Sequence, residues 1–486
     1  IYDIAYPHGK GNERHVHTGK RPGTATTLSP RVGFTSDVLG DKTLKLRGGS
    51  GLFMGRSPLV FFTNMPTNSG MVQYQAQLSA KKNVDMSQFA GGLVVNSEGR
   101  PTIDALRSKL IAMGYPENIS PDKGTLPATI SAVSPDFKMP QVWKTTLAVD
   151  YKLPVSFPMQ VTVEGIFDKN VNAACISDWS IPSAGGFARF NGADNRPIYP
   201  AGFRNNLAAF VLENTHKGYF WSANLMVTAR PAEWINLMAS YTHQVRKEIT
   251  GMPGSNAESA FTYVPTSEGP NHIKLHNSQY LTPDRFVASM QINDKCNNHY
   301  SFIYETWRGG YNYSYMTVND MNGDGYNYDA IYVPTDAEVE SGAFRFVSQD
   351  DQDRFMGFLH NNKSLSKYQG KYAEGYSVYN PWVHRVDFSY KHDFKLNIGS
   401  TKHTLQLGID IKNLLNLFNS SWGVSKTLNS AIGSDARILK YEGVDAQGIA
   451  TFSTPSAINA DTKLFTPLHA LGQCWNMGIT VKYIFN

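Results

Sequence analysis

The segment from Asp320 to Asp329 carries the densest set of side chains that could do chemistry. Its oxygen-bearing residues include Asp320, Asn322, Asp324, Tyr326 and Asp329. This spacing matches the opening of an EF-hand loop, in which oxygen ligands bind a hard cation. Position 12 is Ile331 instead of a bidentate Glu, so Asp329 would have to supply the further carboxylate. The segment predicts a calcium ion that orders the loop; the alternative is a polar loop held by its own Asx turns.

A dense set of tyrosines surrounds the same segment: Tyr311, Tyr313, Tyr315, Tyr326 and Tyr328. Aromatic rings on loops could stack on a sugar or a peptide, because loops on a rigid scaffold are the usual place for recognition. The same rings could equally pack one loop against another. Both interpretations stay open from the sequence.

Other residues offer little catalytic chemistry, so we expect no enzyme. Gly48-Gly49-Ser50-Gly51 lacks the spacing of a nucleophile elbow. Three scattered cysteines form no disulfide framework or zinc site, and the pair His15 and His17 lacks a third ligand. A net charge of +5 over 486 residues indicates no nucleic-acid surface.

The elements that must position these loops are strands. Residues 475–486 alternate apolar and polar side chains without a break, which predicts a strand with one apolar and one wettable face. About 9 to 11 such residues cross a bilayer when the strand is tilted. The chain contains no run of 18 apolar residues, which excludes spanning helices, whereas 59 aromatic residues (25 Tyr, 26 Phe, 8 Trp) suit the girdles of a membrane barrel. A soluble all-β protein is the alternative.

The same alternation recurs in pairs of segments: residues 30–36 with 43–53, 141–153 with 159–167, 219–230 with 234–245, 285–292 with 299–307, and 382–394 with 403–414. With the closing strand we expect about eleven antiparallel strands. Short and long connections alternate, as short periplasmic turns and long extracellular loops do in outer-membrane barrels. One loop should carry a docked helix from Thr102 to Met113. Polar residues of the non-lipid face should pair with each other or with a plug: Lys144, Asp150, Glu164, Arg385, Asp387, Asp410 and Lys412.

Single-chain bacterial barrels close with an even number of strands, so eleven would be part of a larger barrel. We expect residues 1–27 to form an extracellular loop or entry segment and residues 28–486 to form the C-terminal part of the barrel. No signal peptide is recognisable at the start, and we expect that segment and any plug to lie upstream of this sequence.

Several stretches in succession resemble the C-terminal half of TonB-dependent outer-membrane receptors of the Oar-like group of Bacteroidota, which are related to SusC and RagA. These stretches are LSPRVGF (28–34), LRGGSGLF (46–53), PQVWKTTLAVDYKLP (140–154), NDMNGDGYNYDAIYVP (319–334), NPWVHRVDFSY (380–390), IKNLLNLFN (411–419) and the closing strand. The resemblance implies a 22-stranded transmembrane β-barrel around an N-terminal plug. It also implies import driven by the periplasmic TonB complex acting on that plug, and it allows a surface lipoprotein partner.

The expected function is therefore import of a ligand captured by extracellular loops, in a chain located in the outer membrane of a Gram-negative bacterium. Two alternatives stay open: a barrel-anchored surface adhesin or assembly component, and a passive porin. Nothing in the sequence identifies the ligand.

Overall fold

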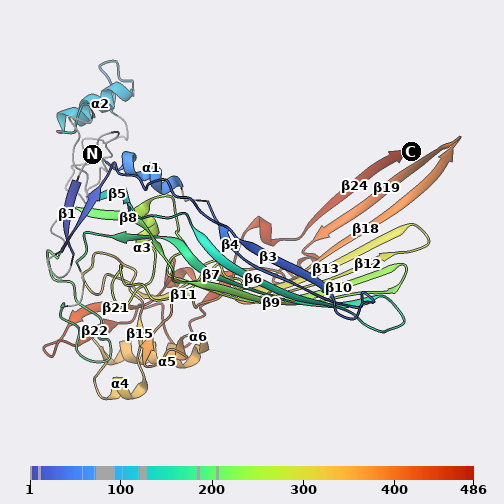
Figure 1. The fold of residues 1–486 in the computed structure, drawn as a ribbon. Coiled ribbons are helices and arrows are strands. Elements are labelled where there is room, and N and C mark those ends of the chain that lie inside the picture. The colour runs from blue at the N-terminus through green and yellow to red at the C-terminus, as the bar shows by residue number, and fades with distance from the viewer. Residues whose placement is uncertain are drawn as a thin grey trace.

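The computed structural model describes residues 3–8, 12–56, 59–69, 72, 94–100, 102–118, 120, 129–182, 186–203 and 207–485. Its main feature is an antiparallel sheet of eleven long strands (Figure 1). Within this group, each strand pairs with the strand that precedes it and the strand that follows it in the sequence. The strands are β3 (Arg31–Asp37), β4 (Leu44–Met54), β6 (Gln141–Lys152), β7 (Met159–Asp178), β9 (Tyr219–Ala232), β10 (Ile235–Glu248), β12 (Asp284–Asn293), β13 (Asn298–Arg308), β18 (Val383–Ile398), β19 (Thr401–Lys412) and β24 (Asn476–Phe485). They coincide with the strands and pairs predicted from alternation, which confirms the antiparallel all-β fold class.

The register of the strands produces one apolar face. Val149 lies opposite Val163, Val163 opposite Leu225, and Leu225 opposite Tyr241. Side chains alternate along each strand, so the apolar positions of all these strands reach the same side of the sheet. Val163 and Leu225 keep 52% and 47% of their surface exposed. Exposed apolar surface that extends over several strands indicates contact with lipid or protein.

Aromatic side chains gather near both ends of the apolar face. Those near the end with the long loops include Trp143, Phe167, Trp221 and Trp382, and those near the end with the short turns include Tyr151, Tyr300, Phe394 and Tyr483. Two aromatic bands around an apolar one are the pattern of a membrane-spanning β-sheet, because amphipathic rings favour the two membrane interfaces.

The opposite face of the sheet is polar, and its charges pair. Arg47 on β4 contacts both Asp150 on β6 and Glu164 on β7, at 3.0 Å each. Lys144 lies 3.9 Å from Asp168. These contacts confirm that Lys144, Asp150 and Glu164 pair on this face. Two other residues predicted for the polar face hold loops in place. Arg385 donates to the carbonyl of Gly423, and Asp387 accepts from the backbone N–H of Asn413. Asp410 instead contacts the neighbouring strand, where it lies 3.4 Å from the hydroxyl of Thr480.

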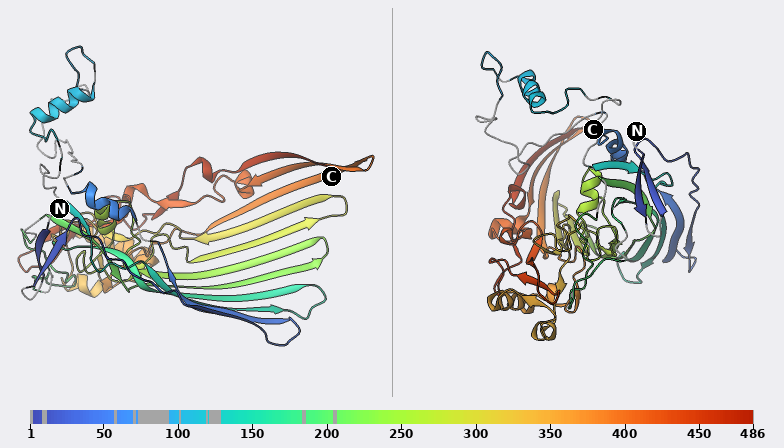
Figure 2. Two further views of the ribbon diagram at one scale, coloured as in Figure 1. Left: turned by 45° about the horizontal axis from the view of Figure 1, so that its top comes forward. Right: turned by 90° about the vertical axis from the view of Figure 1, so that its left-hand side faces the viewer.

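The sheet curves without closing. Figure 2 shows the long strands as a curved wall with β3 at one margin and β24 at the other. Within the described residues, β3 pairs only with β4 and β24 only with β19. Both marginal strands are exposed along most of their length.

Several strand ends differ from the predicted ones, and two of the differences have a clear structural cause. β7 continues eleven residues past Phe167 to Asp178, and this extension pairs with β8 (Ala208–Thr215), which pairs in parallel with β5 (Thr129–Val133). β19 stops at Lys412 because Asn413 has a left-handed conformation with φ 55°, and α7 (Leu414–Phe418) follows.

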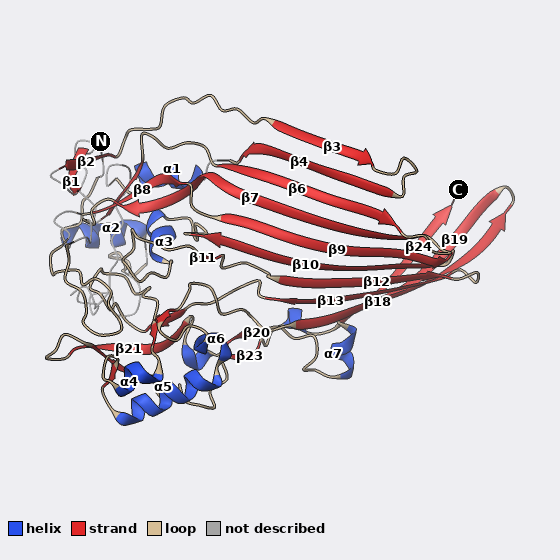
Figure 3. Ribbon diagram, turned by 60° about the horizontal axis from the view of Figure 1, so that its bottom comes forward, coloured by secondary structure: helices blue, strands red, loops and turns tan. Residues whose placement is uncertain are grey.

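Two of the long connections at the loop end, residues 309–382 and 413–475, fold together into one compact unit, here called the loop lobe (Figure 3). Its helices are α4 (Asp336–Glu340), α5 (Gln349–Asn361), α6 (Lys363–Ser366) and α7, with 3₁₀ turns at Ser430–Ile432 and Leu471–Gln473. Its short strands are β14 (Tyr315–Thr317), β15 (Tyr332–Val333), β16 (Arg345–Phe346), β17 (Lys371–Tyr372), β20 (Lys426–Leu428), β21 (Ala436–Val444), β22 (Ala450–Ser453) and β23 (Phe465–Pro467). The core of the lobe includes Phe344 stacked on Phe452, with ring centroids 4.6 Å apart.

The remaining elements lie outside the long strands. They are the hairpin β1 (Asp3–His8) and β2 (Asn12–His17), the helices α1 (Leu59–Thr67), α2 (Ile103–Ala112) and α3 (Ala257–Thr262), and β11 (His276–Asn277). The hairpin lies within the predicted entry segment 1–27, and its Tyr6 and Val16 pack on β5 and β8. Helix α2 begins directly after Thr102, the first residue of the predicted helical segment, whose side chain caps the helix by accepting from the N–H of Ala105. None of its residues is buried, so the expectation that it docks on the barrel is wrong for this structure.

Among the described residues, no helix combines the length and the apolar character that crossing a membrane would need.

Candidate functional site

The predicted cation loop lies in the loop lobe and is shaped by its own hydrogen bonds. The two carboxylate oxygens of Asp320 accept from the backbone N–H groups of Gly323 and Gly325, at 2.9 and 2.8 Å. Asn322 accepts from Asp324, and Asp324 accepts from Tyr326. Gly323 has φ 78°, a left-handed conformation that glycine adopts without strain. The sequence therefore predicts the turns of this loop correctly.

The end of the loop is anchored by a buried ion network. The side chain of Arg196 is fully buried, and its Nη1 lies 3.0 Å from Asp329 Oδ1. Its Nε and Nη2 contact the two oxygens of Asp194 at 3.0 and 2.8 Å, and Nη2 also donates to the carbonyl of Ala330. Burial opposes the charge of Arg196, but Asp194 and Asp329 together raise its pKa above the ordinary value. The network fastens residues 194–196 to the loop lobe.

Asp324 is nearly as buried as Asp329, with 1% of its surface exposed. Burial, and then the nearby charges of Asp329 and Asp320, raise the pKa of Asp324 to about 7. Burial also raises the pKa of Asp329, although Arg196 acts in the opposite direction. The negative charges of Asp320 and Asp329 thus act on Asp324, and removal from water disfavours the ionised forms of the buried Asp324 and Asp329.

The fit of this loop to a calcium ion depends on which oxygens are free. Both oxygens of Asp329 are engaged, one by Arg196 and the other by the N–H of Met321 at 2.9 Å. In the part of the chain that the structure describes, no group of three or more His, Cys, Asp or Glu side chains is arranged to hold a metal ion. Asn322 Oδ1, the third ligand position of an EF-hand, likewise accepts from the backbone N–H of Asp324. The calcium assignment stays a prediction.

The candidate tyrosines divide into buried and exposed rings. Tyr313 and Tyr315 are 7% and 0% exposed, and the hydroxyl of Tyr315 bonds to Ser364 within the core of the lobe. These two rings pack loop against loop. Tyr311 keeps 42% of its surface exposed and Tyr328 is partly exposed, so both retain ring surface for a ligand.

Two further tyrosines from the loop before β12 join the exposed pair. Tyr263 contacts Tyr328 with ring centroids 5.3 Å apart, and Tyr280 contacts Tyr311 at 5.7 Å. We call these four side chains the tyrosine surface. Tyr263 and Tyr280 are distant in sequence from the other two, and no pattern in the sequence marks them as neighbours.

A charged pair adjoins the tyrosine surface. The Arg437 guanidinium lies 5.4 Å from the ring centroid of Tyr328 and 3.9 Å from the carboxylate of Asp435. Burial raises the pKa of Tyr328 to about 12, and the negative charge of Asp435 contributes to this rise. Burial also raises the pKa of Asp435 itself. The guanidinium also donates to the carbonyls of Thr317 and Asn327, so the surface combines aromatic faces with one partly exposed carboxylate whose charge Arg437 balances.

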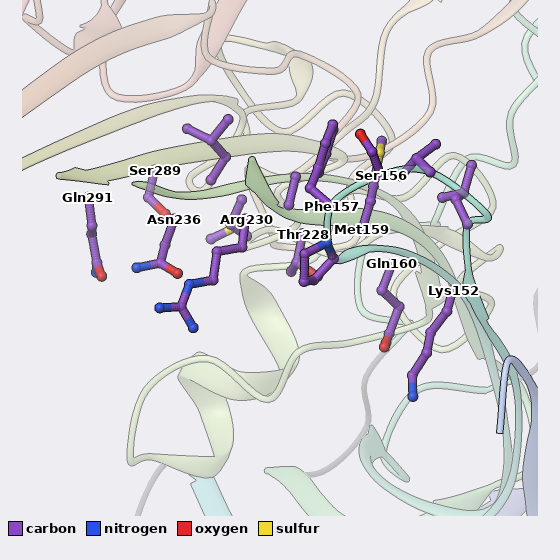
Figure 4. A pocket seen from close by; sticks show the side chains of 16 residues that line it. Lys152, Ser156, Phe157, Met159, Gln160, Thr228, Arg230, Asn236, Ser289 and Gln291 are labelled. Carbon is purple, nitrogen blue, oxygen red and sulfur yellow. The ribbon is translucent and has the colours of Figure 1, made fainter. Parts of the chain in front are cut away.

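A separate hollow of about 740 Å³ lies at the other end of the sheet, beside the turn 153–158 (Figure 4). Its polar lining includes Lys152, Gln160, Thr228, Arg230, Asn236 and Gln291. Among the described residues that line it, none is acidic. Because it lacks a nucleophile with a partnering acid or base, this hollow offers polar contacts and no catalytic arrangement.

Comparison with known proteins gives one family match. The family model described as outer membrane beta barrel domain matches residues 8–436. No curated protein matches the sequence.

Three solved structures are similar to this chain at low sequence identity. They are the outer membrane transporter YddB from Escherichia coli (11% identity, TM-score 0.40), a mutant of the ferric enterobactin receptor PfeA from Pseudomonas aeruginosa (8%, 0.38), and BauA, the ferric preacinetobactin receptor from Acinetobacter baumannii (8%, 0.33). The alignments cover 97%, 94% and 94% of this chain, and 41%, 39% and 36% of the respective structures. The chain thus spans about two fifths of the length of these proteins.

Proposed function

Because the chain belongs to the outer membrane beta barrel domain family, whose members lie in the outer membrane of Gram-negative bacteria, we propose that it is the ligand-capturing part of a TonB-dependent importer. The observation that carries the proposal is the position of the tyrosine surface on folded loops at one end of a membrane-spanning sheet. Loops held by a rigid scaffold are the usual place for recognition. The assignment to an Oar-like receptor of Bacteroidota belongs to the same proposal.

The chemistry of the tyrosine surface suits a neutral polar ligand with flat apolar faces, such as a saccharide. Exposed rings such as Tyr311 offer faces for stacking, while Asp435 offers a hydrogen-bond acceptor and Arg437 balances its charge. Because these two charges offset each other, the surface does not select strongly for a charged ligand. A rigid scaffold also lowers the entropy lost when the ligand binds.

Binding is tested with the full-length protein purified from its native outer membrane. Native mass spectrometry should detect a bound small molecule in the wild type and lose it in the double variant Tyr311→Ala and Tyr328→Ala. Trp422→Ala is the matched control, because Trp422 is an equally exposed aromatic residue of the lobe that lies outside the tyrosine surface. Equal retention by the wild type and the double variant would remove the tyrosine surface from the proposal.

Transport is tested separately from binding. Whole cells should accumulate the identified ligand, and a protonophore that collapses the energy supply should stop the accumulation. A passive porin would continue to equilibrate the ligand under the same treatment, and an adhesin would accumulate none. Either of those results contradicts energised import.

A further inference from the structure

Four cations gather where the apolar face of the sheet meets the loop lobe. They are Lys247 at the end of β10, Arg308 at the end of β13, Lys367 directly after α6, and Lys371 on β17, and we call them the basic cluster. The amino groups of Lys367 and Lys371 lie 4.8 and 5.5 Å from the ring centroid of the same residue, Tyr368. The guanidinium of Arg308 lies 5.5 Å from the ring centroid of Tyr379 and 5.9 Å from that of Trp382.

The charges of the basic cluster are only partly neutralised. Lys247 forms an ion pair with Glu374, and Arg308 forms one with Asp284. Lys367 and Lys371 have no ion pair within 4.0 Å among the described residues. Partial burial and the charges of Lys247, Arg308 and Lys371 lower the pKa of Lys367, although Glu374 acts in the opposite direction. A site with this excess of positive charge attracts an anion.

The register of the long strands places two members of the cluster, Lys247 and Arg308, on the lipid-facing side, and Lys367 and Lys371 of the loop lobe adjoin them. Lys247 pairs with Tyr219, which pairs with Lys169, which pairs with Trp143 of the aromatic band at the loop end. Lys247 also lies an even number of residues from Tyr241, so both side chains leave the strand on the apolar face. Arg308 lies opposite Asp284, two positions beyond the apolar residue Phe286. Both cations therefore sit just beyond the lipid-covered band, at the level of lipid headgroups.

We propose that the basic cluster binds a phosphate group of a lipid in the outer leaflet of the membrane. Lipid is the occupant that the position favours, because the apolar face below the cluster is continuous with it and would hold acyl chains. Lysine and arginine are the side chains that bind phosphate through charge-assisted hydrogen bonds. Trp382 and Tyr379 add the amphipathic rings that favour the headgroup region. This site lies on the outside of the sheet and is independent of ligand capture by the tyrosine surface.

The test neutralises Lys367 and Lys371, which form no ion pair with a carboxylate among the described residues, so that no buried acid loses its partner. The double variant Lys367→Gln and Lys371→Gln is compared with the matched control Lys363→Gln and Lys426→Gln, which removes the same charge from exposed lysines of the lobe outside the cluster. Binding of bisphosphorylated lipid A to the detergent-purified full-length protein is measured by native mass spectrometry. Dephosphorylated lipid A and inorganic phosphate serve as the two further probes.

The wild type and the control should bind bisphosphorylated lipid A equally, and the double variant should bind it about twenty-five-fold more weakly, since each basic residue near an anionic lipid surface contributes about fivefold. Dephosphorylated lipid A should bind weakly to all three proteins. Unchanged binding by the double variant would overturn the proposal. So would inorganic phosphate alone binding to the wild type as tightly as the lipid, because the site would then recognise free phosphate.

Discussion

Replacing Arg196 with Met should destabilise the loop lobe more than any surface charge could. The substitution keeps most of the side-chain volume but removes the cation that faces Asp194 and Asp329, both of them buried. Two buried carboxylates are then left without their partner. Breaking a buried ion pair by removing one member costs about 3 to 5 kcal/mol, so we expect a loss of about that size.

The matched control is Arg189→Met. Arg189 also joins two loops, through an ion pair with Glu268 at 3.0 Å, but its side chain is 40% exposed. An exposed ion pair contributes about 0 to 1 kcal/mol, so the control should lose little. Hydrogen exchange of the detergent-purified protein measures both effects in residues 313–378, and thermal unfolding gives an independent value.

Acidity should rescue the Arg196→Met variant. Without the cation, the largest effect that opposes burial of Asp329 is gone, and burial raises the pKa of that carboxyl group above its unfolded value, so the folded state binds more protons than the unfolded state. The free energy of unfolding of the variant should therefore rise as the pH falls from 8 toward about 5. If Arg196→Met behaves like Arg189→Met, or if its deficit does not shrink in acid, the buried network does not hold the lobe as argued.

Two further predictions concern the cation loop and the apolar face. The pKa of Asp324 is raised to about 7, so its ionisation opposes folding increasingly as the pH rises from about 4 to about 7. In chelator at pH 8, Asp324→Asn should therefore stabilise the lobe by roughly 2 to 4 kcal/mol in hydrogen exchange. Added calcium should stabilise the wild type and not the variant, and an identical response of the two proteins would exclude Asp324 as a ligand. Leu225→Arg on the apolar face should cost about 2 to 4 kcal/mol in unfolding from lipid vesicles, whereas Met226→Arg on the polar face should cost much less, and equal costs would refute the assignment of the faces.

The long strands could be predicted from the sequence because their signal is local. In residues 141–153, for example, Trp143, Leu147 and Tyr151 alternate with polar residues whatever the rest of the chain does. The extension of β7 beyond Phe167 could not be predicted in this way. Its residues pair with β8 above the membrane band, where both faces are covered by protein and the alternation disappears.

The candidate site was predictable only in its local turns. Asp320 and its glycines form the loop that their spacing indicates. The anchor of that loop, Arg196, lies 133 residues away from Asp329 in sequence, and one arginine has no pattern that reveals its partner. Burial is equally non-local: Tyr311 and Tyr315 look alike in the sequence, but the ring of Tyr315 lies within the core of the loop lobe, where its hydroxyl bonds to Ser364 of α6.

The two margins of the sheet, β3 and β24, present backbone N–H and C=O groups with no neighbouring strand in the described residues. Hydrocarbon supplies no hydrogen bonds, and each unsatisfied group there costs several kcal/mol. Such an edge strand favours pairing with another strand along its whole length in a bilayer. In a bilayer, both margins of this sheet therefore require strands that pair with them along their length.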